Sequence, residues 1–271
     1  MHNEKNIVIK IGTSSLTYDD GTLNKDIIKD ICEATTILKQ RGHKIILVSS
    51  GAIGAGLSQL GCHEKPQELS LKQAIAAVGQ TILMQTYQEY YAMQNQLCAQ
   101  ILLTNDIIAH PVKRDNVRQT IHKLHELNVI PIVNENDSVS TVEIESTVFS
   151  DNDTLSAIVS ILVDADMLLL FSDVDGLYKK KNGVLTKEIL TYVSDLSDVN
   201  QHVSSQSSAL GRGGMRMKIK AIDLATKEGI DVVLSNITTV KNLDQIISEK
   251  TIGTFFKGGV KDDNKKNWTT S

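Results

Sequence analysis

A lysine interrupts an aliphatic run near the N-terminus. Residues 7–11 read Ile-Val-Ile-Lys-Ile, and Gly-Thr-Ser follows at once. Such a short run is typical of a strand buried on both faces of a parallel sheet, where a lysine is costly unless an anion meets its charge. Glycine and hydroxyl residues suit a turn that brings backbone N–H groups near a ligand. The segment therefore predicts either that Lys10 serves an anion site or that its ammonium group reaches water at the strand end.

Small residues follow a second apolar run. The strand predicted at 44–49 leads into Ser50 and Gly51, and Gly54 and Gly56 come soon after. Ligands of open α/β sheets bind at the carboxyl ends of the strands, and helix N-termini there attract anions. The glycine spacing is not that of a dinucleotide site. The alternative is a tight turn whose glycines serve only packing.

Carboxylates and carboxamides mark two more positions. Asn134–Asp137 follows the strand predicted at 129–133, and Asp151–Asp153 opens the helix predicted at 153–163. These groups can bind an ammonium group, orient lysines or hold a metal ion. Asp and Asn are also common N-caps, so capping is the simpler explanation of the second group, and the two roles can coexist.

Two segments combine turn residues with charges. Ser172–Gly176 ends the strand predicted at 167–171, which an ordinary Asp-Gly turn also explains. Leu210–Lys218 contains three glycines and three cations and leads into the helix predicted at 214–228. Glycines and cations at a helix N-terminus fit polyphosphate binding, although a flexible basic linker has a similar composition.

Composition excludes several classes of function. The chain has 271 residues, a net charge of -4 and 4% aromatic residues, which argues against a nucleic-acid partner. Its three cysteines are widely spaced, so neither a disulfide framework nor a zinc site is indicated. No apolar segment is long enough to span a membrane. We expect a cytoplasmic protein without a membrane partner.

Strand-like and helix-like segments alternate along the chain. This alternation predicts an α/β fold with a mostly parallel sheet and helices on both faces. The prolines at 66, 111 and 131 are expected at loop or strand edges, and the polar stretches 134–153 and 194–213 are expected to be binding loops or lids. The predicted strands are 6–11, 44–49, 98–103, 129–133, 167–171 and 231–235, and the predicted helices are 25–40, 70–95, 113–127, 153–163, 214–228 and 240–249.

Taken in order, these segments resemble the amino acid kinase family. The matching stretches are VIKIGTSSLT, GHKIILVSSGAIGAG, KQAIAAVGQ, VIPIVNENDSV, DNDTLSA, LLLFSDVDGLY, LGRGGMRMK and IGTFF. The resemblance implies a three-layer α/β/α sandwich over residues 1–260, with a tail at 261–271 and without the C-terminal RNA-binding-like module of longer members. Residues up to about 165 are expected to bind the acceptor and the remainder the nucleotide.

The activity implied by this resemblance is transfer of the γ-phosphoryl group of ATP to the side-chain carboxylate of L-glutamate, with Mg²⁺ accompanying ATP. This reaction is the first step of proline biosynthesis. Proline is implied as a feedback inhibitor, and a homodimer or homotetramer as the assembly. A non-catalytic metabolite-binding regulator of the same fold, or a kinase for another small acidic metabolite, remain the alternatives.

The resemblance also implies roles for individual residues. Lys10 and Lys218 match lysines that neutralise the transferring group, and Asp153 matches the carboxylate that orients them. Gly12, Gly51 and Gly213 are expected to offer backbone N–H groups to phosphate or carboxylate. Substrate contacts are expected at Ser50, Gly51, Asp137 and Asn152; ATP contacts at Lys10, Gly12, Ser172, Asp173, Arg212, Gly213, Gly214, Met215, Arg216, Met217 and Lys218; and no residue is assigned to a metal.

The last motif departs from the family pattern. Members usually carry a sequence close to G-T-G-G-M-x-T-K, whereas Arg212 and Met217 replace the two threonines here. Met217 removes a hydroxyl group, Arg212 adds a cation, and the lysine is kept. Activity is therefore expected to survive, and nucleotide affinity is the property in question.

Overall fold

The computed structural model describes residues 4–62, 66–104, 107, 110–139, 152–181, 184–199, 212–249 and 252–260. Strands and helices alternate through most of this length, with short 3₁₀ turns at Leu196–Val199 and Ile237–Asn242. In chain order the elements are β1 (Asn6–Ile11), α1 (Thr13–Leu16), α2 (Lys25–Gln40), β2 (Lys44–Val48), α3 (Ala52–Gln59), α4 (Leu69–Met93), β3 (Leu97–Leu103), α5 (Pro111–Glu126), β4 (Val129–Glu135), α6 (Asn152–Leu162), β5 (Met167–Ser172), β6 (Leu177–Lys181), β7 (Val184–Leu190), β8 (Tyr192–Val193), α8 (Arg212–Lys227), β9 (Asp231–Asn236), α9 (Leu243–Glu249) and β10 (Thr254–Phe256).

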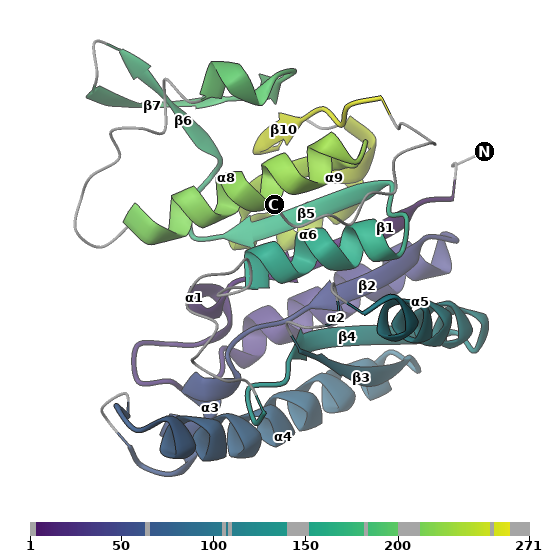
Figure 1. Ribbon diagram of the computed structural model, residues 1–271, viewed down its shortest axis with the longest axis vertical. Coiled ribbons are helices and arrows are strands. Elements are labelled where there is room, and N and C mark those ends of the chain that lie inside the picture. Colours follow the sequence, from purple (N-terminus) through teal and green to yellow (C-terminus); the bar gives the residue numbers. More distant parts are fainter. Residues whose placement is uncertain are drawn as a thin grey trace.

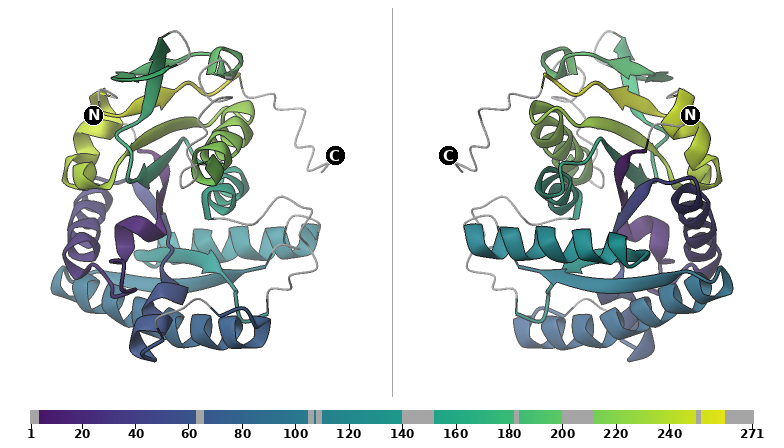
Figure 2. Two further views of the ribbon diagram at one scale, coloured as in Figure 1. Left: turned by 90° about the vertical axis from the view of Figure 1, so that its left-hand side faces the viewer. Right: turned by 90° about the vertical axis from the view of Figure 1, so that its right-hand side faces the viewer.

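A central eight-stranded sheet organises the molecule. Its strand order is β3-β4-β2-β1-β5-β9-β10-β8, and every pairing is parallel except that of β10 with β9. Helices α2, α4 and α9 cover one face, and α5, α6 and α8 cover the other (Figures 1 and 2). The predicted α/β/α sandwich with a mostly parallel sheet is confirmed.

The alternation of side chains along β1 determines the face of the sheet on which Lys10 lies. Ile7, Ile9 and Ile11 belong to the core shared with α2, α4 and α9, whereas Val8 belongs to the core shared with α5, α6 and α8. Side chains alternate between the faces of a sheet. Lys10 therefore lies on the Val8 face, toward α6 and α8.

The six predicted strands and six predicted helices are present, but the sequence missed several short elements. The hairpin of β6 and β7 reads Leu-Tyr-Lys-Lys-Lys in its first strand, which is too polar to resemble a buried strand. Helices α1 and α3 begin directly after Gly12 and Gly51; neither was among the predicted helices, although a helix N-terminus was one of the two interpretations of the segment after β2. The helix predicted at 240–249 starts with a 3₁₀ turn, and α9 begins only at Leu243.

Pro131 lies inside β4 and not at a strand edge as expected. Strand β4 pairs with β3 along its whole length, whereas its pairing with β2 starts only at Ile132. The missing N–H of Pro131 thus falls where one side of the strand has no ladder to complete. Most of the predicted loops 134–153 and 194–213 lies outside the described residues.

Helices α3 and α4 touch backbone to backbone. A Cβ atom added at Gly79 would lie 1.7 Å from the carbonyl oxygen of Ala52, and one at Gly56 would lie 2.0 Å from the carbonyl oxygen of Ile75. No side chain fits between the helices at these points. The contact fixes the start of α3, which follows Ser50 and Gly51, against the middle of α4.

Replacing Gly79 with alanine tests this close contact. We expect Gly79→Ala to destabilise the protein by about 3 kcal/mol, because the added methyl group displaces backbone rather than a flexible side chain. Urea unfolding followed by circular dichroism measures the change. Gly214→Ala is the matched control, since a Cβ there meets nothing within 4 Å. Equal stability of the two variants would show that the helices can separate at little cost.

Candidate active site

One buried carboxylate binds two lysines from distant parts of the chain. Oδ1 of Asp153 lies 2.5 Å from Nζ of Lys10, and Oδ2 lies 2.9 Å from Nζ of Lys218. Lys10 and Asp153 are each 5% exposed, and the Lys218 side chain is 12% exposed. Strand β1, the first turn of α6 and the first half of α8 supply the three groups. The structure thus brings together all three residues expected to be catalytic.

The two ammonium groups keep this carboxylate ionised. Burial alone would raise the pKa of Asp153, but Lys10 and Lys218, through charge and hydrogen bonds, outweigh it and hold that pKa below its ordinary value. Two cations and one anion leave a net charge of one positive unit at the end of β1. The cluster can attract an anion, and its carboxylate is a weak base.

Gly12 gives the cluster open space. Its N–H already donates to the carbonyl oxygen of Phe171 at 3.3 Å, so it does not offer the free backbone donor that was expected. A Cβ at this position would instead lie 3.4 Å from Nζ of Lys10. The absence of a side chain at Gly12 leaves room beside the Lys10 ammonium group.

A second cluster of amides and hydroxyls lies next to the charges, because Asn152 precedes Asp153. Nδ2 of Asn152 donates to the carbonyl oxygen of Ser49 at 2.6 Å, to Oγ of Ser50 at 2.8 Å and to Oδ1 of Asn134 at 3.0 Å. The side chains of Asn152 and Asp153 therefore make tertiary contacts and do not act simply as caps. Ser50 and Asn152 are together, as expected for substrate contacts.

Gly51 connects the second cluster to α3. It is the residue before the first helical position and has a φ of 93°, which favours glycine. A Cβ here would approach Cγ2 of Thr17 to 3.3 Å. The turn after β2 therefore needs glycine to bring α3 back beside Ser50.

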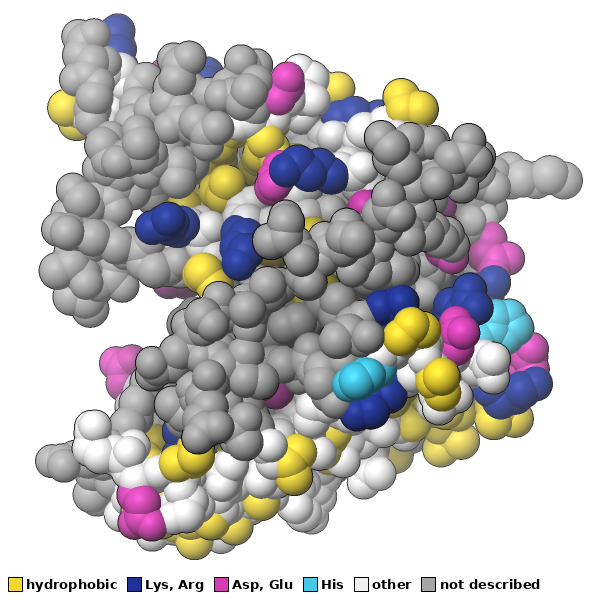
Figure 3. Space-filling model, viewed as in Figure 1, with side chains coloured by type: hydrophobic (Ala, Val, Ile, Leu, Met, Phe, Trp, Pro, Cys, Tyr) yellow, Lys and Arg dark blue, Asp and Glu magenta, His cyan; other side chains and the backbone are white. Residues whose placement is uncertain are grey.

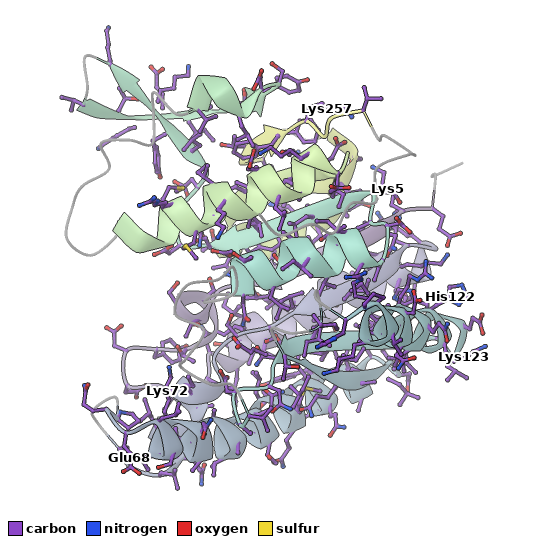
Figure 4. The ribbon with its side chains drawn as sticks, viewed as in Figure 1. Lys5, Glu68, Lys72, His122, Lys123 and Lys257 are labelled. Carbon is purple, nitrogen blue, oxygen red and sulfur yellow. The ribbon has the colours of Figure 1, made fainter. Side chains whose placement is uncertain are left out.

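Asp137 is a half-buried carboxylate after β4, at the same edge of the sheet. Burial raises its pKa, and the charge of Lys72 opposes that rise without cancelling it. Lys72 lies on the first turn of α4, close to Glu68 (Figure 4). A cationic group on a bound ligand would relieve the cost of ionising Asp137.

The residues expected on the nucleotide side divide into two groups. Ser172 and Asp173 lie at the end of β5, and Oγ of Ser172 donates to Oδ1 of Asp173 at 2.8 Å. Asp175 accepts from Nδ2 of Asn236 at 2.9 Å and from the hydroxyl of Tyr178 at 3.1 Å. The Asp-Gly turn predicted here is thus tied to the end of β9.

The first turns of α8 form the other group. Gly214 and Arg216 are exposed and Met217 is half-buried, whereas Met215 packs in the core with α6. The helix begins at Arg212, but the side chain of Arg212 and the surroundings of Gly213 lie outside the described residues. On this face Lys and Arg side chains gather over α8 (Figure 3).

Sequence reasoning singled out Asn134 behind Asn152 but gave no role to the glutamines beyond it. Nδ2 of Asn134 donates to Oε1 of Gln80 at 2.9 Å, and Nε2 of Gln80 donates to Oε1 of Gln100 at 2.9 Å. Asn134 is polar but only 3% exposed, because it is the last but one residue of the buried strand β4. An amide at the end of an apolar strand is the signal that pointed to Asn134, whereas Gln80 on α4 only ends the stretch KQAIAAVGQ of the family resemblance, which assigned it no role.

The described part of the chain contains neither a cluster of metal-binding side chains nor a membrane-spanning helix. No group of three or more His, Cys, Asp or Glu side chains there is arranged to hold a metal ion. None of its helices is both long enough and apolar enough to cross a bilayer.

Comparison with known proteins identifies the family. A model of the amino acid kinase family matches residues 5–236, from the start of β1 to the end of β9. The chain belongs to the amino acid kinase family. The match includes every residue of both clusters.

Relatives with assigned names match this chain over nearly its full length. A protein named glutamate 5-kinase from Ligilactobacillus salivarius is 40% identical over 94% of this chain and 97% of its own. One of the same name from Clostridium tetani is 43% identical over 93% of this chain and 94% of its own. A third, from Trichormus variabilis, is 42% identical, but the match spans only 69% of its length, so longer relatives exist.

Solved structures show the same fold at low identity. Carbamate kinase from Giardia lamblia superposes with a TM-score of 0.65 at 15% identity, over 96% of this chain and 100% of its own. Isopentenyl phosphate kinase from T. acidophilum gives 0.61 at 14% identity, over 93% and 99%. These likenesses support the architecture alone.

Asp137 gives a prediction in which stability and ligand binding change in opposite directions. Its pKa is raised in the folded state, so ionising it costs folding free energy above that pKa, and the cost disappears as the pH falls through it. We expect ligand-free Asp137→Asn to unfold at a slightly higher temperature than the natural protein at pH 7.5. The difference should shrink in acid.

The same variant should lose affinity for a cationic ligand group. We expect the KM for an amino-acid acceptor to rise at least tenfold, because a charge-assisted hydrogen bond is lost. Calorimetric unfolding scans at pH 7.5 and 4.5, with steady-state kinetics, measure both effects. If the variant is less stable than the natural protein by the same amount at both pH values, the cost of ionising buried Asp137 does not determine the stability difference.

Proposed function

We propose that this protein is an ATP-dependent kinase that phosphorylates the side-chain carboxylate of L-glutamate. The observation that carries the proposal is the pair of ammonium groups on one buried carboxylate, next to a cluster of amide and hydroxyl groups. Relatives at about 40% identity named glutamate 5-kinase favour glutamate among carboxylate acceptors. The product, L-glutamyl 5-phosphate, begins proline biosynthesis.

No side chain of the charge cluster is suited to act as a general base, which fits a carboxylate acceptor. An oxygen of the acceptor attacks the γ-phosphorus, the bond from phosphorus to the β,γ-bridging oxygen breaks, and the electron pair leaves with ADP. A carboxylate is ionised near pH 7, so no proton has to be removed. Asp153 could not remove one readily, because its two lysines hold its pKa low.

Lys10 and Lys218 are proposed to be the catalytic cations. Acceptor and nucleotide are both anionic and repel each other, and phosphoryl transfer depends mainly on alignment and charge stabilisation. Asp153 holds both ammonium groups in place. Charges positioned in advance need no reorganisation as negative charge builds up on the transferring group.

The acceptor is proposed to bind in the part of the chain before about residue 165. Asp137 supplies a carboxylate for the substrate ammonium group, and Ser50, Gly51 and Asn152 supply polar contacts at the turn after β2. The remainder of the chain to residue 260 is proposed to bind ATP, through Ser172 and Asp173 after β5 and through residues 212–218.

ATP is proposed to enter as its Mg²⁺ complex. Mg²⁺ is commonly held by substrate phosphates with few protein ligands. This agrees with an arrangement in which Asp153 is already bound to two ammonium groups.

The family resemblance is also the basis for our proposals on regulation and assembly. We propose that L-proline inhibits by binding near Asp137 and Asn152, since it shares its α-carboxylate and amino group with glutamate. A homodimer or homotetramer is the proposed assembly. A cytoplasmic location suits the three cysteines, all of which are free.

An acceptor panel tests the proposed reaction. The purified protein is incubated with ATP, Mg²⁺ and hydroxylamine, which traps an acyl phosphate as a hydroxamate. We expect hydroxamate only with L-glutamate, and not with aspartate or N-acetylglutamate. Release of ADP is followed in parallel for UMP. Lys10→Ala should lower kcat by about 100- to 1,000-fold, because one preorganised charge is lost.

Lys29→Ala is the matched control, because Lys29 is exposed on α2 and pairs only weakly with Glu33. It should retain full activity. Turnover with another acceptor and none with glutamate would overturn the proposed substrate. Glutamate binding without turnover in the folded natural protein would favour a non-catalytic regulator.

A further inference from the structure

A row of side-chain amides connects the acceptor cluster with the surface of the molecule. It runs from Asn152 on α6 to Asn134 on β4, then to Gln80 on α4 and Gln100 on β3, with separations of 3.0, 2.9 and 2.9 Å. Asn134 is buried, Gln80 is half-buried and Gln100 is exposed on the edge strand. Four elements thus contribute one amide each to a continuous chain, called here the amide row.

The direction of the hydrogen bonds in the amide row is set by two backbone groups. The N–H of Glu135 donates to Oδ1 of Asn134 at 2.9 Å, so this atom must be the oxygen. The carbonyl oxygen of Ser49 accepts from Asn152 at 2.6 Å, so the atom facing it must be the nitrogen. Because backbone groups cannot exchange donor for acceptor, neither asparagine can flip its amide without losing a bond.

The direction of these hydrogen bonds requires an acceptor for Nδ2 of Asn134, and Gln80 supplies it. With Oδ1 of Asn134 facing Glu135 and Asn152, Nδ2 of Asn134 points to Oε1 of Gln80. Asn134 is 3% exposed, so its amide nitrogen would be left without a partner in the interior if that acceptor were lost. Gln80 therefore stabilises the one orientation of Asn134 that suits Asn152.

The orientation reaches the acceptor site through Asn152. All the hydrogen bonds of its side chain within the described residues use Nδ2. Its Oδ1 thus remains the atom that it can present to a ligand. A carbonyl oxygen with this fixed direction suits the ammonium group of an amino acid and not a carboxylate.

The backbone holds Gln80 at the required distance. Gly79, its neighbour, packs against the carbonyl oxygen of Ala52 so closely that a Cβ would lie 1.7 Å away. Helix α4 cannot shift along α3 without breaking this contact. The same contact therefore positions both the start of α3, beside Ser50, and the acceptor oxygen of Gln80.

We propose that Gln80 is a positioning residue for substrate recognition, which acts through Asn134 to fix the amide of Asn152 toward the amino group of the acceptor. Gln100 completes the row at its exposed end, where water can replace it. This inference rests on the proposed function, because it assumes an amino-acid acceptor. It adds a residue that touches neither the substrate nor the reacting atoms.

The test separates acceptor affinity from chemistry. Gln80→Met keeps the length of the side chain but removes its amide, and we expect a rise of about tenfold in the KM for L-glutamate. The kcat and the KM for ATP should change by less than about twofold. Gln80→Glu keeps an acceptor oxygen for Asn134, so it should restore the KM to within about threefold of the natural value.

Gln88→Met is the matched control, since Gln88 is exposed on the same helix. It should leave every constant unchanged, and Gln100→Met should change the KM by less than about twofold. If Gln80→Met does not fold, Gln80→Ala takes its place. An unchanged KM in the folded Gln80 variant, or an equal loss in the Gln80→Glu variant, would overturn the proposal.

A measurement without substrate keeps this proposal separate from the proposed function. In ¹⁵N-edited NMR spectra of the ligand-free protein, the side-chain NH₂ of Asn134 should exchange slowly with water. It should exchange faster in Gln80→Met but not in Gln88→Met. Absence of glutamate turnover in the natural protein would refute the proposed function, whereas unchanged exchange at Asn134 would refute the amide row itself.

Discussion

The structure depends on one buried carboxylate that must satisfy two ammonium groups, that of buried Lys10 and that of partly buried Lys218. An ion cluster of this kind gains little stability overall, because desolvation offsets the attraction between the charges, but removing one member is expensive. Asp153, Lys10 and Lys218 therefore act as one unit. The end of β1 and the first half of α8 must therefore both lie beside Asp153.

The sheet meets that requirement by its topology. Strand β1 lies between β2 and β5, so the lysine near its end is surrounded by the turns that follow several parallel strands. Alternation along β1 directs Lys10 toward α6 and α8, the two helices that carry its partners. The turn after β2 and the end of β4 then place Ser50 and Asn134 against Asn152. Charge and recognition are thus adjacent because Asn152 and Asp153 are neighbours in the chain.

Patterns in the sequence predict the central elements well and the connections between distant residues poorly. Strand β1 was predictable because four aliphatic residues interrupted only by Lys10 form a short apolar run with few other structures available to it. The charge of Lys10 showed that a partner was needed, but pattern alone did not name Lys218, which lies 208 positions away, and the family resemblance did. Gln80 ends one of the stretches that resemble the family, but its role was not predictable, because its contact with Asn134 spans 54 residues and arises from helix packing at a glycine. Strand β6 was missed because Leu-Tyr-Lys-Lys-Lys is too polar to resemble a buried strand, and it pairs with β7 outside the main sheet.

Coupling between the two lysines tests the central claim most directly. The single-turnover rate of phosphoryl transfer is measured for the natural protein, Lys10→Met, Lys218→Met and the double variant. If both lysines act through Asp153, the double variant should lose much less than the product of the two single losses, since removing either lysine already disturbs the unit. Losses that multiply, with a coupling below about 0.5 kcal/mol, would contradict the account and show two independent charges.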